Sequence, residues 1–296
     1  MVFPALCRSI CLKGWFSQMR KIKIVADSSA NLLTLRTAAF ASAPLKIITA
    51  DREFVDNAQL DVSAMLDYFS QYKDKSKTSC PNPADWVDAM GDAEDVFCVA
   101  ITSGLSGSYN AACIAKQMYE ADHEGARVHV IDSLSAGPEL TLIVEKLEEL
   151  ICQGMDYESI CQTIDAYRAN TGLLFMLESL NNFAANGRVS PAVAKIAGVL
   201  GIRIVGKASD QGTLEPTDKC RGEAKSLSTL VANLKRNGLS RGKVQIAHCR
   251  NELGARKLKD LIEAALPDVT VAIGENRGLC SYYAEIGGLL VGYEKM

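Results

Sequence analysis

The part of this chain best suited to binding chemistry is a loop rich in hydroxyl groups and glycine, Thr102-Ser103-Gly104-Leu105-Ser106-Gly107-Ser108-Tyr109-Asn110. It joins an apolar run at residues 96–101 to a segment with helical character. In an open parallel sheet, ligands bind beyond the carboxyl ends of the strands, at turns of this kind. The glycines allow close approach to the backbone, and the free N–H groups of the next helix attract anions. The loop therefore predicts an anion site, although an ordinary capped helix start has the same pattern.

A second cluster of hydroxyl groups, Lys77-Thr78-Ser79-Cys80-Pro81, precedes a helix that we expect to begin near residues 83–86. Taken alone, Thr78 or Ser79 is interpreted as the cap of that helix. The cluster gains interest if the fold brings it to the same edge of the sheet as the first loop. Two sets of hydroxyl donors would then converge on one ligand.

A serine hydrolase motif is only partly present. The segment from Gly104 to Ser108 approaches the pattern G-x-S-x-G, but Ser108 stands where the second glycine belongs. Catalysis by Ser106 would also need a histidine base. His129 lies within an apolar run and His248 ends another, and histidines in such places are more often core or edge residues than catalytic ones.

Nucleotide and metal sites are not indicated. Residues 201–208 approach a Walker A motif, but position 208 is alanine, where the motif needs a hydroxyl for magnesium, and the intervening residues read as a strand. No G-x-G-x-x-G fingerprint follows a predicted strand, and no set of metal ligands has suitable spacing. We therefore expect a binding protein without a metal or cofactor.

The composition narrows the class of protein. Of the 296 residues, 48% are apolar and 23% are charged, which are values of a globular chain. Lys and Arg number 32 against 35 Asp and Glu, and aromatic residues make up 6%, so neither a basic surface nor stacking platforms for nucleic acid are expected. The ten cysteines form no C-x-x-C pair, which predicts reduced thiols in a cytoplasmic protein.

The first twenty residues differ from the rest. Their short apolar start is interrupted by Arg8 and Lys13, so it fits neither a membrane span nor a signal peptide. Periodic structure begins just after Met19. We therefore expect translation to start at Met19, with residues 1–20 a non-native or disordered extension. No other segment reaches transmembrane length, so we expect no stable membrane insertion.

Strand and helix patterns alternate along the first half. Strands are expected at residues 22–26, 96–101 and 128–131, and helices at 108–120 and 139–152. The run at 96–101 is apolar throughout, which is typical of a parallel strand buried on both faces. This alternation predicts a doubly wound parallel sheet.

The second half mixes hairpins with helices. Pro191 fits the first turn of a helix that reaches about Leu200, and a turn at 210–212 follows the strand at 202–205. Further strands are expected at 172–177, 244–248 and 269–273, and further helices at 221–236 and 252–265. This order predicts an α/β fold of two domains: a parallel-sheet domain over residues 21–160 and a mixed-sheet domain over 161–296.

Six short motifs together resemble the DegV family of fatty-acid-binding proteins. In chain order they are IVADSSA at 24–30, KTS at 77–79, the loop at 102–110, VIDS at 130–133, NGRVS at 186–190 and DKCRG at 218–222. The resemblance runs from about Lys21 to the C-terminus, which also supports Met19 as the start.

The resemblance implies an α/β/α domain and a smaller α/β domain, with a long-chain fatty acid between them. Thr78 and Ser106 match the family residues whose hydroxyl groups bind the carboxylate, and Arg188 matches an arginine near the head group. Ser103 and Gly107 belong to the same loop and complete the expected head-group set. Buried methylene groups would then supply the affinity.

The resemblance also implies a partner. Characterised relatives present the acid to a separate kinase subunit, which uses ATP to make an acyl phosphate, so the carrier itself would not be an enzyme. Two alternatives stay open: a lipid binder or sensor without a kinase partner, and a serine hydrolase that uses Ser106.

One departure from the family concerns the C-terminal region. Many relatives carry a histidine before Gly-Pro-Gly there, whereas this chain reads GLCSYYAEIGG at 278–288. Glu285 or Tyr283 lies near the position of the missing histidine. A glutamate beside a bound carboxylate would repel it unless protonated.

Overall fold

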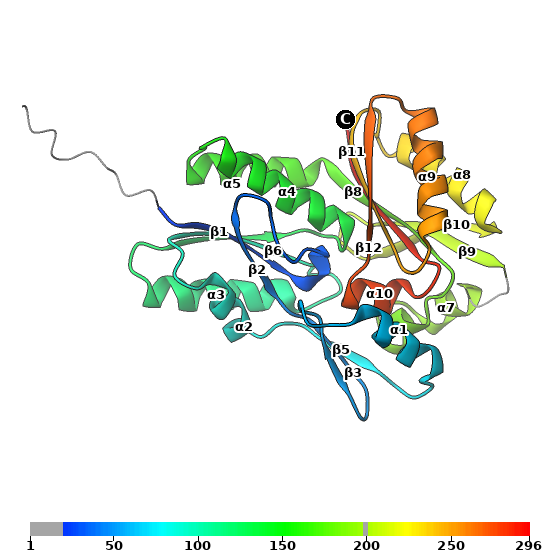
Figure 1. Ribbon diagram of the computed structural model, residues 1–296, viewed down its shortest axis with the longest axis horizontal. Helices are drawn as coiled ribbons and strands as arrows, with labels where there is room; N and C mark the ends of the chain where they lie inside the picture. The colour runs from blue at the N-terminus through cyan, green and yellow to red at the C-terminus, as the bar shows by residue number, and fades with distance from the viewer. Residues whose placement is uncertain (1–19, 198–200) are drawn as a thin grey trace, which may run out of the picture.

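Figure 1 shows the computed structural model of the chain, which describes residues 20–197 and 201–296. Its strands form a four-stranded, a six-stranded and a three-stranded sheet. The proposed start at Met19 and the expected helix end near Leu200 fall outside the described residues. In the part of the chain that is described, no helix combines the length and apolar character needed to cross a membrane.

The four-stranded sheet has the order β2-β1-β6-β7, and each neighbouring pair is parallel. Its strands are β1 (Ile22–Asp27), β2 (Ala39–Ala43), β6 (Asp95–Ala100) and β7 (Arg127–Asp132). One face is covered by α2 (Pro83–Met90) and α3 (Ser108–Asp122), and the other by α4 (Pro138–Cys152) and α5 (Tyr157–Ala169). In β6, Phe97 packs toward α4 and α5 while Cys98 packs toward α2 and α3, so the strand must be apolar throughout.

The six-stranded sheet has the order β10-β9-β8-β13-β11-β12, and only β11 and β12 run parallel. Its strands are β8 (Thr171–Leu177), β9 (Ile202–Ala208), β10 (Leu214–Arg221), β11 (Gly242–His248), β12 (Val269–Glu275) and β13 (Leu289–Glu294). Helices α8 (Glu223–Arg236) and α9 (Glu252–Ala265) cover one face. In β8, Leu174 and Met176 pack toward these helices, so Leu173, Phe175 and Leu177 project from the opposite face.

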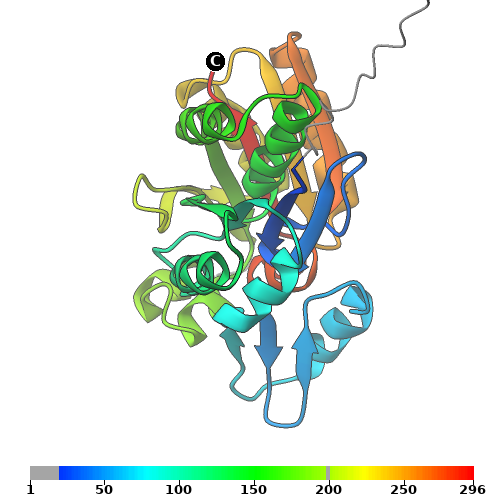
Figure 2. The same cartoon turned by 90° about the vertical axis from the view of Figure 1, so that its left-hand side faces the viewer.

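Shorter elements pack against that opposite face. The small sheet has the order β4-β3-β5, from β3 (Lys46–Ile48), β4 (Glu53–Val55) and β5 (Lys77–Ser79). It lies with α1 (Val62–Gln71) at the bottom of Figure 2. The remaining elements here are η1 (Ser28–Ala30), α6 (Asn181–Ala185), α7 (Pro191–Ala197) and α10 (Gly278–Ala284).

These sheets confirm the fold class expected from the sequence, a parallel-sheet part followed by a mixed-sheet part. The sheet of the second part is the larger, with six strands against four. The sequence patterns did not reveal α5 or β13, although β13 lies in the middle of its sheet. Two glycines precede it and Gly292 interrupts it, which weakens the strand pattern. A Cβ on Gly292 would lie 2.5 Å from the backbone of α4 at Glu139 N, so only glycine permits this packing.

Helix α4 packs against both large sheets. It packs on β1 and β6 of the parallel sheet and on β11 and β13 of the mixed sheet. Gln245 on β11 also donates hydrogen bonds of 3.1 Å to the carboxylate of Glu145 on α4. The two parts therefore share a buried helix.

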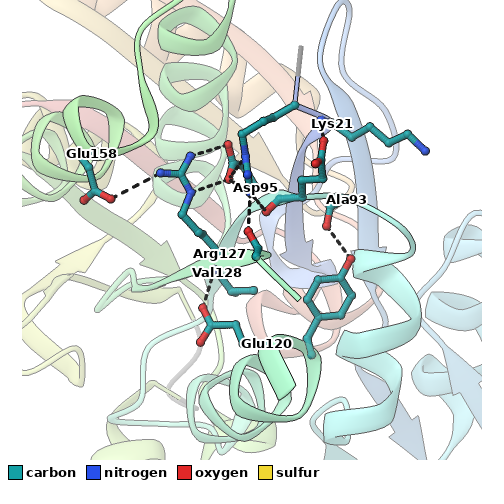
Figure 3. A network of polar contacts seen from close by, with 11 residues as sticks. Lys21, Ala93, Asp95, Glu120, Arg127, Val128 and Glu158 are labelled. Carbon is teal, nitrogen blue, oxygen red and sulfur yellow. Dashed lines mark hydrogen bonds and ion pairs between the residues drawn. The ribbon is translucent and has the colours of Figure 1, made fainter. Parts of the chain in front are cut away.

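An ion-pair network lies where the parallel strands begin (Figure 3). Arg127 donates two hydrogen bonds of 2.8 Å to the buried carboxylate of Asp95, and Arg20 adds a third of 3.0 Å. Arg127 also pairs with Glu158 at 3.7 Å. Arg20 is thus held in the folded body, which corrects the expectation that the N-terminal extension includes it.

Candidate functional site

A cavity of about 320 Å³ lies on the face of the mixed sheet that α8 and α9 leave uncovered. Its walls come from the mixed sheet, from the carboxyl end of the parallel sheet, from α10 and from the small sheet. Most of its lining is apolar, including Leu45, Ile101, Leu173, Phe175, Leu177 and Leu290. A volume of this size suits one small or elongated ligand.

Polar groups gather at one part of this cavity, and we call them the polar cluster. Its members line the cavity and come from four separate segments: Thr78, Ser106, Gly107, Arg188 and Tyr283. Four of the five were expected as head-group residues, and Tyr283 was one of two candidates for the place of the missing histidine. The fold therefore brings together residues that are up to 205 positions apart.

Thr78 lies on β5 and does not cap a helix, which corrects the interpretation made from the sequence. The cap of α2 is Asn82, whose side chain accepts from Asp85 N at 3.0 Å in a reciprocal capping box. Thr78 Oγ1 instead shares a hydrogen bond of 2.7 Å with the Tyr283 hydroxyl. Pairing of β5 with β3, Thr78 opposite Ile47, holds it in place.

Ser106 lies just before α3, as the sequence predicted. Its Oγ accepts a hydrogen bond of 3.3 Å from Ser108 N, so the hydroxyl proton is free to be donated into the cavity. Gly107 forms the helix N-cap without a side-chain cap, and a Cβ there would lie 3.3 Å from Cys80 Sγ. The loop is thus both a capped helix start and a donor surface.

Asp27, at the end of β1, positions this loop from behind. Its buried carboxylate accepts from Ile101 N at 2.8 Å and from Ser108 Oγ at 2.6 Å. Burial raises the pKa of Asp27, although the hydrogen bonds from Ser108 and Ser29 oppose the rise. The carboxylate thereby ties the end of β6 to the start of α3.

Arg188 approaches the loop from the mixed-sheet part of the chain. Its Nε donates to Leu105 O at 3.2 Å and its Nη1 to Asn186 O at 2.5 Å. Asn186 in turn accepts from Thr78 N at 3.1 Å through its side chain. The intervening Gly187 has φ of +72°, a conformation that glycine adopts without strain.

Tyr283 and Glu285, the two candidates for the place of the missing family histidine, have different surroundings. Tyr283 lines the cavity, and burial raises the pKa of its hydroxyl, although Thr78 and Arg188 oppose the rise. Glu285 does not line the cavity, because its carboxylate accepts from Ser179 Oγ at 2.8 Å and Asn182 N at 3.3 Å. Burial raises the pKa of Glu285 as well.

Ser103 also lies away from the cavity. It is exposed, and its N–H donates to Asp132 Oδ1 at 3.1 Å. The residue before it, Thr102, lines the cavity and donates to Gly212 O at 2.9 Å. That bond joins the loop to the turn between β9 and β10. Gly104 of the loop packs closely against the same turn, because a Cβ on it would lie 2.5 Å from Gln211 O.

Sequence reasoning missed the residues that support the polar cluster. Asp56 follows β4 and is buried, and it accepts from Gly278 N at 3.0 Å and Leu279 N at 2.9 Å, the first N–H groups of α10. Asp27 belongs to the motif IVADSSA but was given no role there, and no motif includes Asp56. An acidic residue directly after a short apolar run is the only available signal, and it is a weak one.

The geometry offers no base for catalysis by Ser106. No histidine is among the residues described as lining the cavity, and the only hydrogen bond of Ser106 Oγ to a described residue comes from Ser108 N. His129 shares a contact of 3.1 Å with Asp165 on α5. Within residues 20–197 and 201–296, no group of three His, Cys, Asp or Glu side chains is arranged to hold a metal ion.

Comparison with known proteins adds independent findings. The sequence model of one family, described as uncharacterised protein, DegV family, matches residues 21–295. A DegV domain-containing protein of Streptococcus pneumoniae is 44% identical over 276 residues, which span 92% of this chain and 98% of the relative.

Solved structures agree with this match. A DegV family protein from Eubacterium eligens loaded with heptadecanoic acid has a TM-score of 0.91 at 44% identity, covering 93% of this chain and 100% of that one. The Fatty Acid Kinase (Fak) B3 protein of Streptococcus pneumoniae, loaded with linoleic acid, has a TM-score of 0.91 at 42% identity, with the same coverage.

Proposed function

Because this chain belongs to the DegV family, we propose that it binds one long-chain fatty acid, with the acyl chain in the apolar cavity and the carboxylate at the polar cluster. The observation that carries this proposal is the cavity itself, whose lining is mostly apolar and includes one group of converging donors. Relatives of 44% and 42% identity that were solved with heptadecanoic and linoleic acid support the ligand class.

The physics of the site suits such a ligand. Each buried methylene group contributes about 0.8 kcal/mol, so the acyl chain supplies most of the affinity. Hydrogen bonds to an ionised carboxylate are stronger than neutral ones, and Arg188 brings a positive charge to the same place. The polar cluster therefore fixes the orientation of the acid.

Tyr283, rather than Glu285, would take the role of the missing family histidine at the head group. A tyrosine hydroxyl is protonated near neutral pH, and burial raises the pKa of Tyr283 further, so this hydroxyl can donate a hydrogen bond. Glu285 is held by Ser179 and faces away from the cavity, so it need not repel the carboxylate.

The finer part of the proposal is a carrier role: the protein would present the bound carboxylate to a separate ATP-dependent fatty acid kinase. Gly107 of the polar cluster and Ser79, which follows Thr78, are exposed, whereas Leu177 and Phe175 on the apolar wall are buried. A partner could therefore reach the head group while the acyl chain stays covered.

Mass spectrometry under native conditions tests the ligand. Protein purified without detergent should carry the mass of one long-chain acid, and delipidated protein should take up added acid. Ala208→Phe should reduce uptake because Ala208 lines the cavity. Ala224→Phe, on the exposed surface of α8, is the matched control. Protein that is empty and takes up no acid would contradict the proposal.

The carrier role needs its own test. Loaded protein, a fatty acid kinase and ATP should yield acyl phosphate, and Arg188→Gln should reduce the yield. A known carrier tested with the same kinase is the control. If it yields acyl phosphate and this protein does not, the carrier role is contradicted and a stand-alone lipid binder or sensor is the remaining hypothesis.

A further inference from the structure

One hydroxyl group on the cavity wall is buried without a hydrogen-bond partner among the described residues. Ser135 lines the cavity, is 2% exposed, and its Oγ makes no hydrogen bond to them. Leaving such a group unsatisfied costs free energy, and native structures rarely do so without a reason. The occupant of the cavity is therefore the natural partner of this hydroxyl.

Ser135 differs from the other hydroxyl groups of the wall, because each of those makes at least one hydrogen bond to a described residue. Their hydrogen bonds are Thr78 to Tyr283 (2.7 Å), Ser79 to Cys80 O (3.2 Å), Thr102 to Gly212 O (2.9 Å), Ser108 N to Ser106 (3.3 Å) and Thr213 to Ser209 (2.8 Å). A general tolerance for unsatisfied groups at this wall therefore does not explain Ser135.

The backbone holds Ser135 at this place. Ser135 N donates to Ser133 Oγ at 3.1 Å, and Ser135 O accepts from Ser133 Oγ at 3.0 Å and from Thr102 N at 2.9 Å. The nearby carboxyl of Glu139 is buried, which raises its pKa, and the Ser135 and Thr171 hydroxyls oppose the rise. Thr171 Oγ1 donates a hydrogen bond of 2.7 Å to that carboxyl, whereas the Ser135 hydroxyl lies near it without reaching hydrogen-bond geometry.

Ser135 follows β7, a segment of the wall that contributes no residue to the polar cluster. Two backbone hydrogen bonds lead to it, from Ser106 N to Thr102 O at 3.2 Å and from Thr102 N to Ser135 O at 2.9 Å. Each step spans about 5 Å, so Ser135 lies within roughly 10 Å of Ser106 along the wall. Its neighbours on the wall, Ile101, Ala136 and Leu290, are apolar. An acid held at the polar cluster would therefore meet this hydroxyl along its acyl chain.

Resting on the proposed function, we propose that Ser135 donates a hydrogen bond to the acyl chain and selects acids that carry an acceptor there. The acceptor is an oxygen substituent or a cis double bond, of which the oxygen is the stronger. A saturated chain of the same length would bury the Ser135 hydroxyl with no partner. Ser135 would thus determine which acyl chains the protein prefers, independently of the residues that bind the head group.

Competition binding to delipidated full-length protein tests this inference. The competitors are octadecanoic acid, its cis-monounsaturated counterpart and a series of monohydroxy-octadecanoic acids with the hydroxyl at successive positions. The wild type should bind at least one acceptor-bearing acid about fivefold or more tightly than octadecanoic acid. A maximum within the hydroxy series would identify an oxygen as the acceptor, and a preference confined to the unsaturated acid would identify the double bond.

Ser135→Ala should bring this affinity ratio close to one. Ser135→Cys, of similar volume but a weaker donor, should give an intermediate ratio. The ratio compares two acids in the same variant, so a general loss of stability cancels. Ser135→Ala should also melt no lower than the wild type, because no hydrogen bond within the described structure is lost.

Three results separate the possibilities. A wild type that does not discriminate, or a preference that survives in Ser135→Ala, overturns the inference while fatty acid binding stands. A lower melting temperature with an unchanged ratio also overturns it and assigns the hydroxyl to Glu139. If no acid binds to any variant, the proposed function fails, and the inference fails with it.

Discussion

Thr78 and Tyr283 share a hydrogen bond of 2.7 Å although 205 positions separate them in the chain. Each is half-buried, and each lines the cavity. Burial raises the pKa of Tyr283, and the hydrogen bond with Thr78 opposes this effect. In the proposed site the pair would act as one donor unit, in which one hydroxyl orients the other toward the carboxylate.

At the residue scale, Thr78→Val, Ser106→Ala and Tyr283→Phe should each weaken fatty acid binding by about 1–3 kcal/mol. Thr78→Val with Tyr283→Phe should lose less than the sum of the two, because they remove the same unit. Isothermal titration calorimetry measures these affinities. Ser228→Ala, on the exposed surface of α8, is the matched serine control. Wild-type affinity in all three single variants would refute the head-group assignment.

At the element scale, two buried aspartates hold the starts of α3, which follows Ser106 and Gly107, and of α10, which carries Tyr283. Asp27 binds the Ser108 hydroxyl at the start of α3, and Asp56 binds two N–H groups at the start of α10. A carboxylate at a helix N-terminus satisfies free N–H groups and opposes the helix dipole. The geometry of the cluster thus depends on residues outside the cavity lining.

Asp56→Ala should therefore lower the free energy of unfolding by about 2–4 kcal/mol, because two buried N–H groups lose their acceptor. It should also weaken acid binding through displacement of Tyr283 on α10. Asp61→Ala is the control: it removes the exposed cap of α1, which accepts from Ala64 N at 2.9 Å, and should cost about 1 kcal/mol. Denaturant unfolding compares the two, and equal losses would contradict the assigned role of Asp56.

At the scale of the whole molecule, the ends of the parallel sheet have separate tasks. The carboxyl ends of the strands face the cavity, and the amino ends carry the network of Asp95, Arg127 and Arg20. Burial alone would raise the pKa of Asp95, but the hydrogen bonds and charges of the two arginines outweigh it, so the pKa lies below its ordinary value.

This lowered pKa predicts acid sensitivity. The stabilisation from Asp95 is complete above its unfolded pKa and is lost as the pH falls below about 4, through the folded pKa. Asp27, Asp56 and Glu139 have raised pKa values and act in the opposite direction. We therefore expect Asp95→Asn to have a lower free energy of unfolding than the wild type at pH 7. This difference in free energy should become smaller as the pH falls. Chemical unfolding at several pH values checks this, and a constant difference would count against it.

The two parts of the chain, proposed as domains at residues 21–160 and 161–296, should not be independent. Helix α4 lies in the first range yet covers β11 and β13 of the second. Residues 161–296 expressed alone would expose that face of the mixed sheet. We expect this fragment to aggregate or to lack a cooperative thermal transition, and a monomeric fragment with a sharp transition would contradict a shared core.

The sequence by itself determined many of the local elements, though not α5 or β13, and part of the site. The apolar run at 96–101 required a strand buried on both faces, and the glycine and hydroxyl pattern at 102–110 marked a donor loop before a helix. Such patterns report which face of a segment is buried, because side chains alternate along strands and recur along helices. The family resemblance, which rests on short motifs, additionally identified Thr78 and Arg188.

Only the tertiary structure decided which of these groups meet. Packing turned Tyr283 toward Thr78 and Glu285 toward Ser179, and it placed Ser103 in solvent. It also left the Ser135 hydroxyl on the cavity wall without a hydrogen-bond partner among the described residues. Tyr283 and Glu285 are two positions apart in the sequence, so the local sequence pattern could not predict which of the two side chains points into the cavity. The decision depends on contacts between distant segments, because a hydrogen-bond partner two hundred residues away leaves no periodic signal in the sequence.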